Sequence, residues 1–400
     1  MRGDLDATAR PLRVGLNLLF LGARAGGAGR YAMELPGALL AAEPETDVHL
    51  FVSRDAPAEL REQAWAQSVR WVRCPVGIRG PRARRAFEFA ALPPLAAARG
   101  LDVLHSLANV GPVIVPGVAS VVSLLDLIWM RPPQEWGGSV GVQRSLRLIV
   151  EHDMRHADRV FAISQAEARE ISRSLSVSPE RIHVTPLGVR TPTAVPASED
   201  AVRAELALDE ARVVLSVAQK HPYKNLHRLV RALPELDDDV VLVLPGFPTS
   251  HERELGALAQ ELRVADRVRL PEWLSEGSLA GLYALSSAFA LPSLAEGFGL
   301  PVLEAMLRDV PVACSNISSL AEVAGDAALL FDPECQEEVT GAIRRLLEDR
   351  ALAERLVVRG RERAASFTWA RTGAASLAGY RRAIADRLAS RWLRSSAGSR

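Results

Sequence analysis

Two glutamates in one short segment carry the clearest chemical signal in the sequence. Glu296 and Glu304 are eight positions apart, where an apolar strand-like run ends and a helical pattern begins. Pro301 suits the first turn of that helix, because its missing N–H would have no partner there. Both carboxylates should therefore face the carboxyl edge of a sheet, where ligands of α/β proteins bind. A tight turn alone would explain the proline but not the two glutamates.

The loop between these glutamates is suited to an anion. Gly297 and Gly299 bracket Phe298, and Leu300 follows at the expected start of the helix. Successive backbone N–H groups in such a turn, here those of Phe298, Gly299 and Leu300, form a concavity that binds anions. We therefore expect a negatively charged ligand group at this loop.

The lysines give a second signal. The chain has 48 basic residues, and all are arginine except Lys220 and Lys224, which lie where another strand-like run meets a helix. A lysine at a helix N-terminus opposes the helix dipole, so its presence is better explained when an anion binds beside it. Compact ammonium groups suit a crowded phosphate pocket better than the planar guanidinium group does. A solvated helix start is the alternative interpretation.

A glycine-rich turn follows the first strand-like run. Gly27 and Gly29 lie in this turn, and Arg30 follows at the expected start of a helix. Glycines let the backbone approach a ligand closely, and the free N–H groups of a helix N-terminus favour an anion. The spacing differs from the G-x-G-x-x-G of dinucleotide-binding proteins. A tight turn without a ligand explains this segment equally well.

Three further features each have two interpretations. His105 ends a strand-like run and has either a ligand contact or a structural role. His152 and His156 have the i, i+4 spacing of a zinc site, but Asp153 stands where zinc proteases have glutamate, which favours a solvated helix face. The basic run 79–85 is either a solvated surface or a contact for anionic lipid or a charged acceptor.

The elements that must position these residues alternate between strands and helices. Helical patterns, notably 83–98, 139–156 and 165–175, separate the strand-like runs. This alternation predicts βαβ units with parallel sheets. The strands are expected at 12–20, 47–53, 69–73, 102–106, 119–125, 157–164, 181–187, 211–218, 240–246, 267–271, 287–293, 310–314 and 327–331.

The length of the chain points to two domains. Its 400 residues exceed one ordinary core and fit two α/β domains of about 180 residues each. A proline-containing linker over 191–198 separates an N-terminal domain, 1–190, from a C-terminal domain, 199–375, and 376–400 forms a last helix with a frayed tail. We therefore expect two doubly wound Rossmann-like domains that face each other across a cleft.

The composition excludes several classes of protein. Hydrophobic residues make up 48% and charged residues 24%, and the formal net charge is zero, so disorder and bulk nucleic-acid binding are not expected. The three cysteines form no C-x-x-C pair, which argues against a disulfide framework and a cysteine zinc site and favours the cytoplasm. The N-terminus lacks the apolar stretch of a signal peptide. The uncharged stretch 106–125 contains glycines and prolines, so we expect a loop that leads into a buried strand.

Together these segments resemble glycosyltransferase family 4, whose members have the GT-B fold. The two glutamates look like the E-x7-E motif of retaining glycosyltransferases. The similarity runs in order through GGAGRYAMEL, AISQAE, VTPLGV, PYKNL, SNISSLAEVAGDAALLFDP and FTW, which covers most of the chain. It indicates the fold and the type of reaction but not the substrate.

The resemblance implies a role for each residue of the donor site. Glu296 would contact the ring hydroxyls of a nucleotide-sugar donor, and Glu304 would hold the ribose hydroxyls. Lys224 would bind the phosphates, and Lys220 would supply a second charge, because Tyr223 stands where the family usually has arginine. The backbone of 297–300 would also contact the donor.

The resemblance also implies how the two domains share the substrates. Gly27 and Gly29 would approach the diphosphate across the cleft, with Arg30 in contact with the sugar or the acceptor. The nucleotide would lie mainly on the C-terminal domain and the acceptor on the N-terminal domain. The last helix, 376–400, would cross back to the N-terminal domain.

The expected activity is retaining transfer of a mannose-like hexose or a 6-deoxyhexose from a nucleoside-diphosphate sugar to an acceptor hydroxyl. The acceptor would be a glycan, a lipid-linked molecule or a small molecule, and the enzyme would be cytoplasmic or peripheral at the inner membrane face. No cofactor is expected, and no metal either, because the acidic run 237–239 falls in a turn and not at a strand end. An inactive scaffold and a sugar-nucleotide epimerase are the alternatives.

One segment departs from the family pattern. Asp126 matches an aspartate of the family, but Leu125 stands where the family usually has a histidine that contacts the donor sugar near its 6-hydroxyl. Leucine cannot hydrogen-bond to a hydroxyl but suits a methyl group, which favours a 6-deoxyhexose donor or a sugar that binds differently from the family norm. Alternatively, Leu125 packs in the core and His105 replaces the lost contact.

Overall fold

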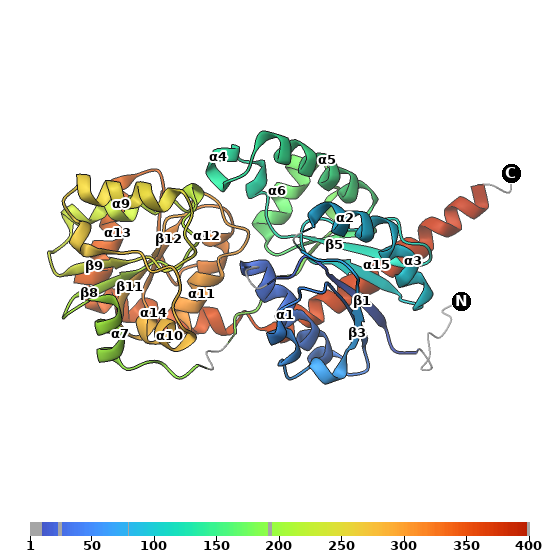
Figure 1. The fold of residues 1–400 in the computed structure, drawn as a ribbon, viewed down its shortest axis with the longest axis horizontal. Helices are drawn as coiled ribbons and strands as arrows, with labels where there is room; N and C mark the ends of the chain where they lie inside the picture. Colours follow the sequence, from blue (N-terminus) through green and yellow to red (C-terminus); the bar gives the residue numbers. More distant parts are fainter. Residues whose placement is uncertain (1–9, 23–25, 79, 191–193, 398–400) are drawn as a thin grey trace.

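The computed structural model describes residues 10–22, 26–78, 80–190 and 194–397. These residues form an N-terminal and a C-terminal α/β unit, each built on a parallel sheet (Figure 1). All thirteen predicted strands are present, each within about three residues of its expected bounds. The predicted class of two doubly wound domains is therefore confirmed.

The sheet of the N-terminal unit has seven strands in the order β3-β2-β1-β4-β5-β6-β7. The order changes direction after β1, and this switch point places the ends of β1 and β4 beside a crevice where ligands bind. Its strands are β1 (Arg13–Leu18), β2 (Asp47–Val52), β3 (Arg70–Arg73), β4 (Val103–Ser106), β5 (Ala119–Leu124), β6 (Arg159–Ala162) and β7 (Ile182–Val184). Its helices are α1 (Gly26–Ala42), α2 (Pro81–Ala90), α3 (Leu92–Ala98), α4 (Pro133–Trp136), α5 (Val140–His156) and α6 (Gln165–Leu175).

The sheet of the C-terminal unit has six strands in the order β10-β9-β8-β11-β12-β13. Here β8 and β11 are neighbours, so the loops that follow them meet at one edge of the sheet. Its strands are β8 (Arg212–Leu215), β9 (Val240–Val243), β10 (Val268–Arg269), β11 (Ser286–Leu291), β12 (Val312–Ser315) and β13 (Leu329–Phe331). Its helices are α7 (Glu199–Leu206), α8 (His227–Ala232), α9 (His251–Glu261), α10 (Glu276–Leu285), α11 (Leu300–Met306), α12 (Ser318–Ala324), α13 (Gln336–Glu348) and α14 (Arg350–Ala365).

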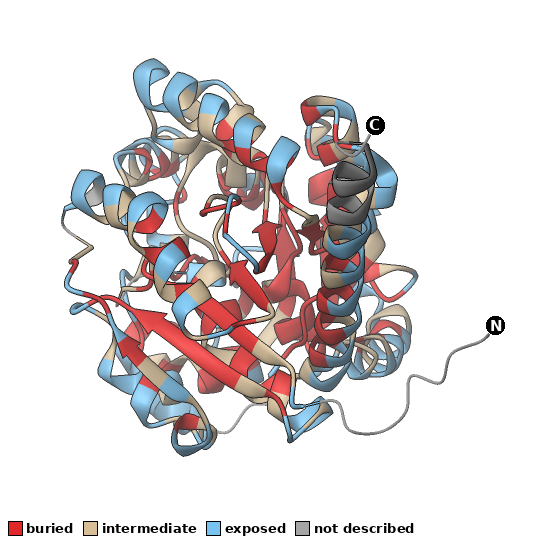
Figure 2. Cartoon of the chain, turned by 90° about the vertical axis from the view of Figure 1, so that its right-hand side faces the viewer, coloured by how far each residue is buried: buried red, intermediate tan, exposed pale blue. Residues whose placement is uncertain are grey.

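The central strands are buried on both faces, because helices cover both sides of each sheet. Every residue of β5 is buried, including its two serines. Figure 2 shows buried strands within a shell of helices whose outer surfaces are exposed. The sequence signal that follows from this burial is a continuous apolar run, which is why the strands could be located from the sequence.

Two helices differ from their predicted bounds. The helix expected over 83–98 is divided at Ala91 into α2 and α3, because Pro93 and Pro94 suit only the first turn of a new helix. The first helix starts at Gly26 and not near Arg30. The glycine turn therefore supplies the first turn of α1.

The last helix, α15 (Trp369–Ala397), runs from the C-terminal unit across the N-terminal unit (Figure 1). Gly373 lies so close to the carbonyl of Ala38 in α1 that a side chain would collide there. The hydroxyl of Thr372 donates a hydrogen bond of 2.7 Å to the carbonyl of Pro186. The return to the N-terminal unit therefore begins before residue 376, where the sequence placed the boundary.

The linker prediction falls partly outside the described residues, since 191–193 are not among them. Ala197 donates a backbone hydrogen bond to Gly277, and the Ser198 hydroxyl caps the start of α7. Within the described part of the chain, no helix is long and apolar enough to span a membrane. The uncharged stretch 106–125 forms a loop followed by β5, as expected.

Candidate active site

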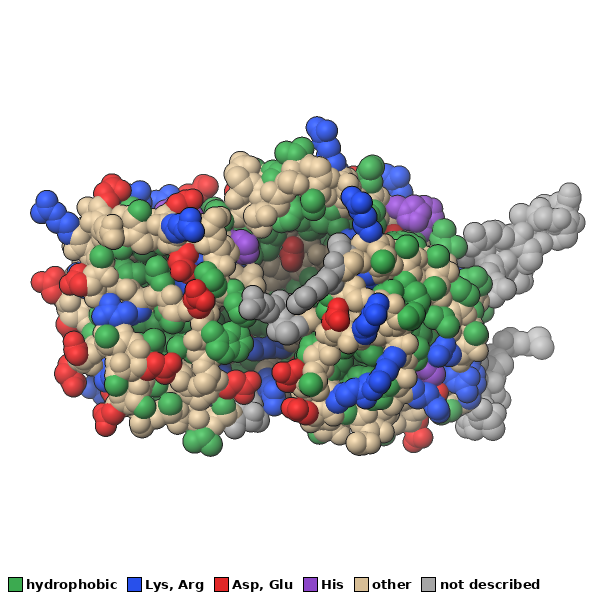
Figure 3. Space-filling view, viewed as in Figure 1, with side chains coloured by type: hydrophobic (Ala, Val, Ile, Leu, Met, Phe, Trp, Pro, Cys, Tyr) green, Lys and Arg blue, Asp and Glu red, His purple; other side chains and the backbone are tan. Residues whose placement is uncertain are grey.

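A cavity of about 630 Å³ lies between the two units and contains most of the predicted residues. Figure 3 shows that the surface is hollowed between the units. The walls come from the start of α1, the loop after β5, and the loops after β8, β9 and β11. Eleven predicted residues line it, namely Gly27, Arg30, Leu125, Asp126, Lys224, Glu296, Gly297, Phe298, Gly299, Leu300 and Glu304.

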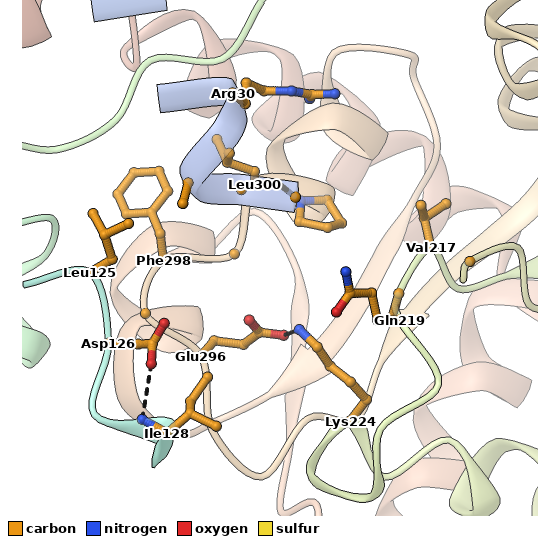
Figure 4. Close-up of a pocket in the computed structure, with 18 of the residues that line it drawn as sticks. Arg30, Leu125, Asp126, Ile128, Val217, Gln219, Lys224, Glu296, Phe298 and Leu300 are labelled. Carbon is orange, nitrogen blue, oxygen red and sulfur yellow. Dashed lines mark hydrogen bonds and ion pairs between the residues drawn. The ribbon is translucent and has the colours of Figure 1, made fainter. Parts of the chain in front are cut away.

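Glu296 and Lys224 form the centre of this cavity. The Lys224 Nζ donates a hydrogen bond of 2.6 Å to Glu296 Oε1, and the Ser293 hydroxyl donates one of 2.8 Å to the same oxygen (Figure 4). Both charged side chains are largely buried, at 13% and 10% exposure. Burial lowers the pKa of Lys224, but the charges of Glu296, Tyr223 and Asp126 and the hydrogen bond to Glu296 together raise it overall. The lysine is therefore a permanent cation in the cavity.

Glu304 lies in α11 and pairs with a residue of the opposite unit. Arg30, on α1, forms an ion pair with its carboxylate, and the Tyr283 hydroxyl lies 3.5 Å from Glu304 Oε2. Glu304 is 11% exposed and Arg30 is 44% exposed at the side chain. This ion pair connects the two walls of the cavity.

The glycine loop before α11 holds the two units close together. At Gly297, a side chain would collide with the carbonyl of Leu125 in the N-terminal unit. Gly299 has a φ of 107°, a conformation that favours glycine, and its neighbour Leu320 leaves little space for a side chain. These two glycines are therefore required by a close contact and by backbone conformation, respectively.

The start of α1 closes the cavity from the N-terminal unit. Gly27 lines the cavity with open space around it, and a side chain at Gly26 would lie 3.7 Å from the Gln219 amide of the opposite unit. The first N–H groups of this helix have no partners within the helix and favour an anion. Gly29 does not line the cavity but is buried inside α1, so the predicted donor contact of Gly29 is wrong. The reason is that the helix begins earlier than expected, at Gly26.

Lys220 does not point into the cavity, contrary to the prediction. Its side chain is fully buried, and Nζ donates hydrogen bonds to the carbonyls of Gly246, at 2.7 Å, and Pro271, at 3.2 Å. It also forms an ion pair of 2.9 Å with Glu252. Lys220 therefore connects the loops after β8, β9 and β10, and Lys224 is the lysine that faces the cavity.

His105 is a structural residue, which was one of its two predicted roles. It is fully buried in β4, with Nδ1 2.7 Å from the Tyr380 hydroxyl of α15 and Nε2 2.8 Å from the Ser123 hydroxyl of β5. Burial lowers its pKa to about 3, so the ring is neutral. It cannot replace the contact that Leu125 lacks, because Leu125 lines the cavity and His105 does not.

Asp126 lies beside Glu296 at the cavity wall (Figure 4). Its Oδ1 accepts a hydrogen bond of 3.1 Å from the Ile128 N–H. Burial raises the pKa of Asp126, and the charge of Glu296 adds to this effect. The carboxyl thus helps to fix the turn that follows β5.

Two family matches cover most of the chain. Residues 25–192 match the family described as Glycosyltransferase Family 4, and residues 198–363 match Glycosyl transferases group 1. The MMP alpha-(1->4)-mannosyltransferase of Mycolicibacterium hassiacum is 32% identical over 324 residues, which is 75% of either protein. The chain belongs to glycosyltransferase family 4. It is a hexosyltransferase, which sets aside the scaffold and epimerase alternatives.

Solved structures confirm the GT-B fold of this glycosyltransferase. Sucrose-phosphate synthase from Thermosynechococcus elongatus has a TM-score of 0.74 at 22% identity and covers 94% of this chain and 99% of its own. Anabaena Alr3699/HepE in complex with UDP-glucose has a TM-score of 0.67 at 18% identity and covers 95% and 100%, respectively. At these identities the similarity concerns the fold.

Several residues of the glycosyltransferase cavity were not predicted from the sequence. Gln219 points into the cavity beside Lys224 (Figure 4). Phe247 and the 71% exposed Trp273 also line it, and their rings stack with centroids 5.4 Å apart. Gln219 follows a predicted strand end and adjoins Lys220, which could have identified it, whereas the aromatic pair joins two distant loops.

The remaining candidates lie outside this cavity. The rings of His152 and His156 stack at 4.4 Å on α5. Among the described residues, no group of three or more His, Cys, Asp or Glu side chains could hold a metal ion. Arg79 is not among the described residues, and the rest of the basic run forms the start of α2.

Proposed function

We propose that this glycosyltransferase transfers a hexose from a nucleoside-diphosphate sugar to an acceptor hydroxyl, with retention of the anomeric configuration and without a metal ion. The observation that carries the proposal is the Lys224–Glu296 ion pair, which lies in the cavity between the units with the start of α1 on the opposite wall. The mannosyltransferase name of the relative supports a mannose-like hexose. The UDP-glucose bound to Alr3699/HepE supports a nucleotide-sugar donor.

The charges in the cavity suit a diphosphate leaving group. Lys224 supplies a buried cation, and the first N–H groups of α1 supply partial positive charge on the other wall. Fixed charges and N–H groups in a partly enclosed site stabilise negative charge that develops in a transition state. Glu296 orients the Lys224 ammonium and would bind sugar hydroxyls, whereas Glu304 would bind the ribose hydroxyls.

The proposed reaction proceeds on one face of the sugar. The bond between C1 and the phosphate oxygen breaks, and the acceptor oxygen bonds to C1 from the same face. The acceptor proton passes to an oxygen of the departing phosphate, so no carboxylate nucleophile of the glycosidase type is required. Lys224 would stabilise the phosphate as its charge increases.

A thermal-shift screen against GDP-, UDP- and dTDP-sugars tests the donor. A donor at 100 times its Kd should stabilise the protein by about 2.7 kcal/mol. The Lys224→Ala variant should lose this shift, because the variant lacks the cation in the cavity. Proton NMR of the product then reports its anomeric configuration. No shift with any nucleotide sugar, or a product with inverted configuration, would refute the proposal.

The environment of Leu125 indicates which sugar the donor carries. Leu125 lines the cavity with only 8% exposure, and Figure 4 shows it beside Phe298. This apolar surface would leave a 6-hydroxyl without a partner, at a cost of about 1–3 kcal/mol. We therefore propose a 6-deoxyhexose donor, because a methyl group suits this surface.

Competition between GDP-mannose and GDP-rhamnose tests the 6-deoxyhexose proposal. The wild type should prefer GDP-rhamnose, and Leu125→His should shift the preference toward GDP-mannose, because an imidazole can hydrogen-bond to the 6-hydroxyl. Preference of the wild type for GDP-mannose, unchanged in Leu125→His, would contradict the proposal.

A further inference from the structure

A second cavity, of about 210 Å³, lies within the N-terminal unit. It is formed where β1 and β4 end, and α2 and α5 contribute to its walls. In Figure 1, α5 lies at the upper edge of this unit and α2 lies below it. The ends of β1 and β4 mark the switch point of the sheet, which is where ligands of such sheets bind. Its volume is below that of most drug-sized sites, so it suits a small chemical group.

Two arginines of α2 line this second cavity, and each has a buried nitrogen without a hydrogen bond. These nitrogens are Arg84 Nε and Arg85 Nη1, and neither has a hydrogen-bond partner among the described residues. Arg84 Nε forms only a long ion pair, of 4.0 Å, with Glu88 Oε2. A buried donor without an acceptor is unfavourable. The planar guanidinium group matches the oxygens of a phosphate or a carboxylate.

Polar groups on the same wall could bind hydroxyls. The buried Asn17 amide donates hydrogen bonds of 3.2 Å to Glu88 Oε1 and to the Ser106 hydroxyl. These bonds fix the Glu88 carboxyl beside the two arginines. Burial raises the pKa of Glu88, whereas the hydrogen bond from Asn17 and the charges of Arg84 and Arg85 act in the opposite direction.

One loop connects the second cavity to the active site. Asn109 lines the second cavity, and its φ of 60° turns the chain there. Its Oδ1 accepts a hydrogen bond of 2.8 Å from the Leu125 N–H, and Leu125 lines the active site. The second cavity is therefore connected to the proposed sugar site through a single hydrogen bond, between Asn109 and Leu125.

We infer that the second cavity binds a phosphate or carboxylate group of the acceptor, so that the acceptor is an anionic polyol or glycoside. This inference rests on the proposed function, because it names the acceptor class of the same reaction. Arg84 and Arg85 bind the anion, and the wall formed by Asn17 and Glu88 binds neighbouring hydroxyls.

Calorimetry with inorganic phosphate tests the anion site on the full-length chain. A Lys224→Ala background prevents phosphate from binding in the active site. In that background, Arg85→Gln and Arg84→Gln should each weaken phosphate binding about tenfold to a hundredfold, the effect of one lost charged hydrogen bond. Arg82→Gln is the matched control, because Arg82 is exposed on the same helix and does not line the cavity. Equal affinity in all three variants would overturn the inference.

A variant with the opposite effect covers the case in which the arginine variants fail to fold. Glu88→Gln removes negative charge from the cavity wall and should tighten phosphate binding, whereas an unchanged affinity would count against the site. Donor binding is measured separately, in the Lys224 wild-type background, and should be unaffected by Arg85→Gln. If phosphate binding depends on Arg85 but no nucleotide sugar binds, the proposed function fails and the anion site stands.

A soluble acceptor and a lipid headgroup would present the same anion, and two further measurements separate them. Transfer to a hexose phosphate should exceed transfer to the free hexose, and Arg85→Gln should remove the difference. Sedimentation with phosphatidylglycerol and phosphatidylcholine vesicles tests the lipid. Arg85-dependent binding to phosphatidylglycerol alone would assign the anion to a headgroup. The inference would be overturned if the phosphate did not increase transfer and the protein did not bind to either kind of vesicle.

Discussion

The two lysines of the chain should respond to substitution in opposite ways. Lys224 faces the active site and pairs with Glu296 at 2.6 Å, whereas Lys220 is fully buried and connects three loops. Lys224→Ala removes the cation that would stabilise the departing diphosphate. Loss of one such donor costs roughly 10²- to 10³-fold in rate, or about 2.7–4 kcal/mol. We therefore expect kcat/KM to fall by at least about a hundredfold.

The effect of Lys224→Ala on folding should be small by comparison. Glu296 keeps its hydrogen bond from Ser293, and the cavity lets water reach its carboxylate, so we expect a smaller loss than the roughly 3–5 kcal/mol of a fully buried pair. Lys220→Met, in contrast, removes hydrogen bonds to two carbonyls and an ion pair in the interior. Breaking a buried pair costs about 3–5 kcal/mol, so this variant should be the less stable one. Its kcat/KM per folded molecule should fall less than about tenfold.

Initial rates on purified, folded protein and chemical denaturation of the same samples separate these effects. Lys224→Arg is a useful addition, because the guanidinium is planar and larger than the ammonium and should restore activity only in part. Wild-type kcat/KM in Lys224→Ala would refute the phosphate role of Lys224. A stable Lys220→Met variant that loses as much activity as Lys224→Ala would show that Lys220 contributes to the reaction and not only to folding.

Three other predictions follow from the structure. Activity should survive excess EDTA, and a complete loss that Mg²⁺ or Mn²⁺ restores would contradict the metal-free reaction. Burial raises the pKa of Glu167 to about 9. Above the ordinary pKa of a glutamate, the unfolded chain has released this proton while the folded protein still holds it. The free energy of unfolding should therefore fall as the pH rises from the ordinary pKa toward about 9. Glu167→Gln should therefore stabilise the protein by up to about 4–5 kcal/mol at pH 8, because each unit of pKa shift corresponds to about 1.4 kcal/mol, but not at pH 4, whereas equal unfolding curves at pH 8 would contradict this. Glu322 accepts hydrogen bonds of 2.9 and 2.8 Å from the first N–H groups of α6 in the opposite unit. Glu322→Ala should therefore lower kcat/KM about 3- to 30-fold, which corresponds to the free energy of one lost helix cap. Unchanged kinetics would show that this contact does not contribute to activity.

The fold could be predicted because its signals are local. Parallel strands covered on both faces appear as continuous apolar runs, such as the fully buried β5. The loops with Lys224 and Glu296 follow neighbouring strands, β8 and β11, so their meeting in one cavity follows from the alternation of strands and helices. The glutamates and Lys224 were predicted to share a site because the sequence resembles glycosyltransferase family 4.

Side-chain direction could not be predicted in the same way. Lys220 and Lys224 are four residues apart, but a 3₁₀ turn over Pro222–Lys224 changes the direction of the chain, so that Lys224 lines the cavity and Lys220 does not. The carbonyls that hold Lys220 belong to the loops after β9 and β10. His105 likewise depends on Tyr380, which is 275 positions away in a helix that returns from the other unit.

The contacts between the units mark the limit of what the sequence can reveal. Residues that would touch the ligand lie at strand ends and form motifs, whereas Glu322 caps a helix 157 positions away without any motif. The close approach of Gly297 to the Leu125 carbonyl is another contact of this kind, because the sequence indicated this glycine only as part of an anion-binding loop. Both contacts bring the two walls of the active site together without supplying a charge to the reaction. Their effects on the kinetics should therefore report closure of the cavity, separately from the chemistry of Lys224 and Glu296.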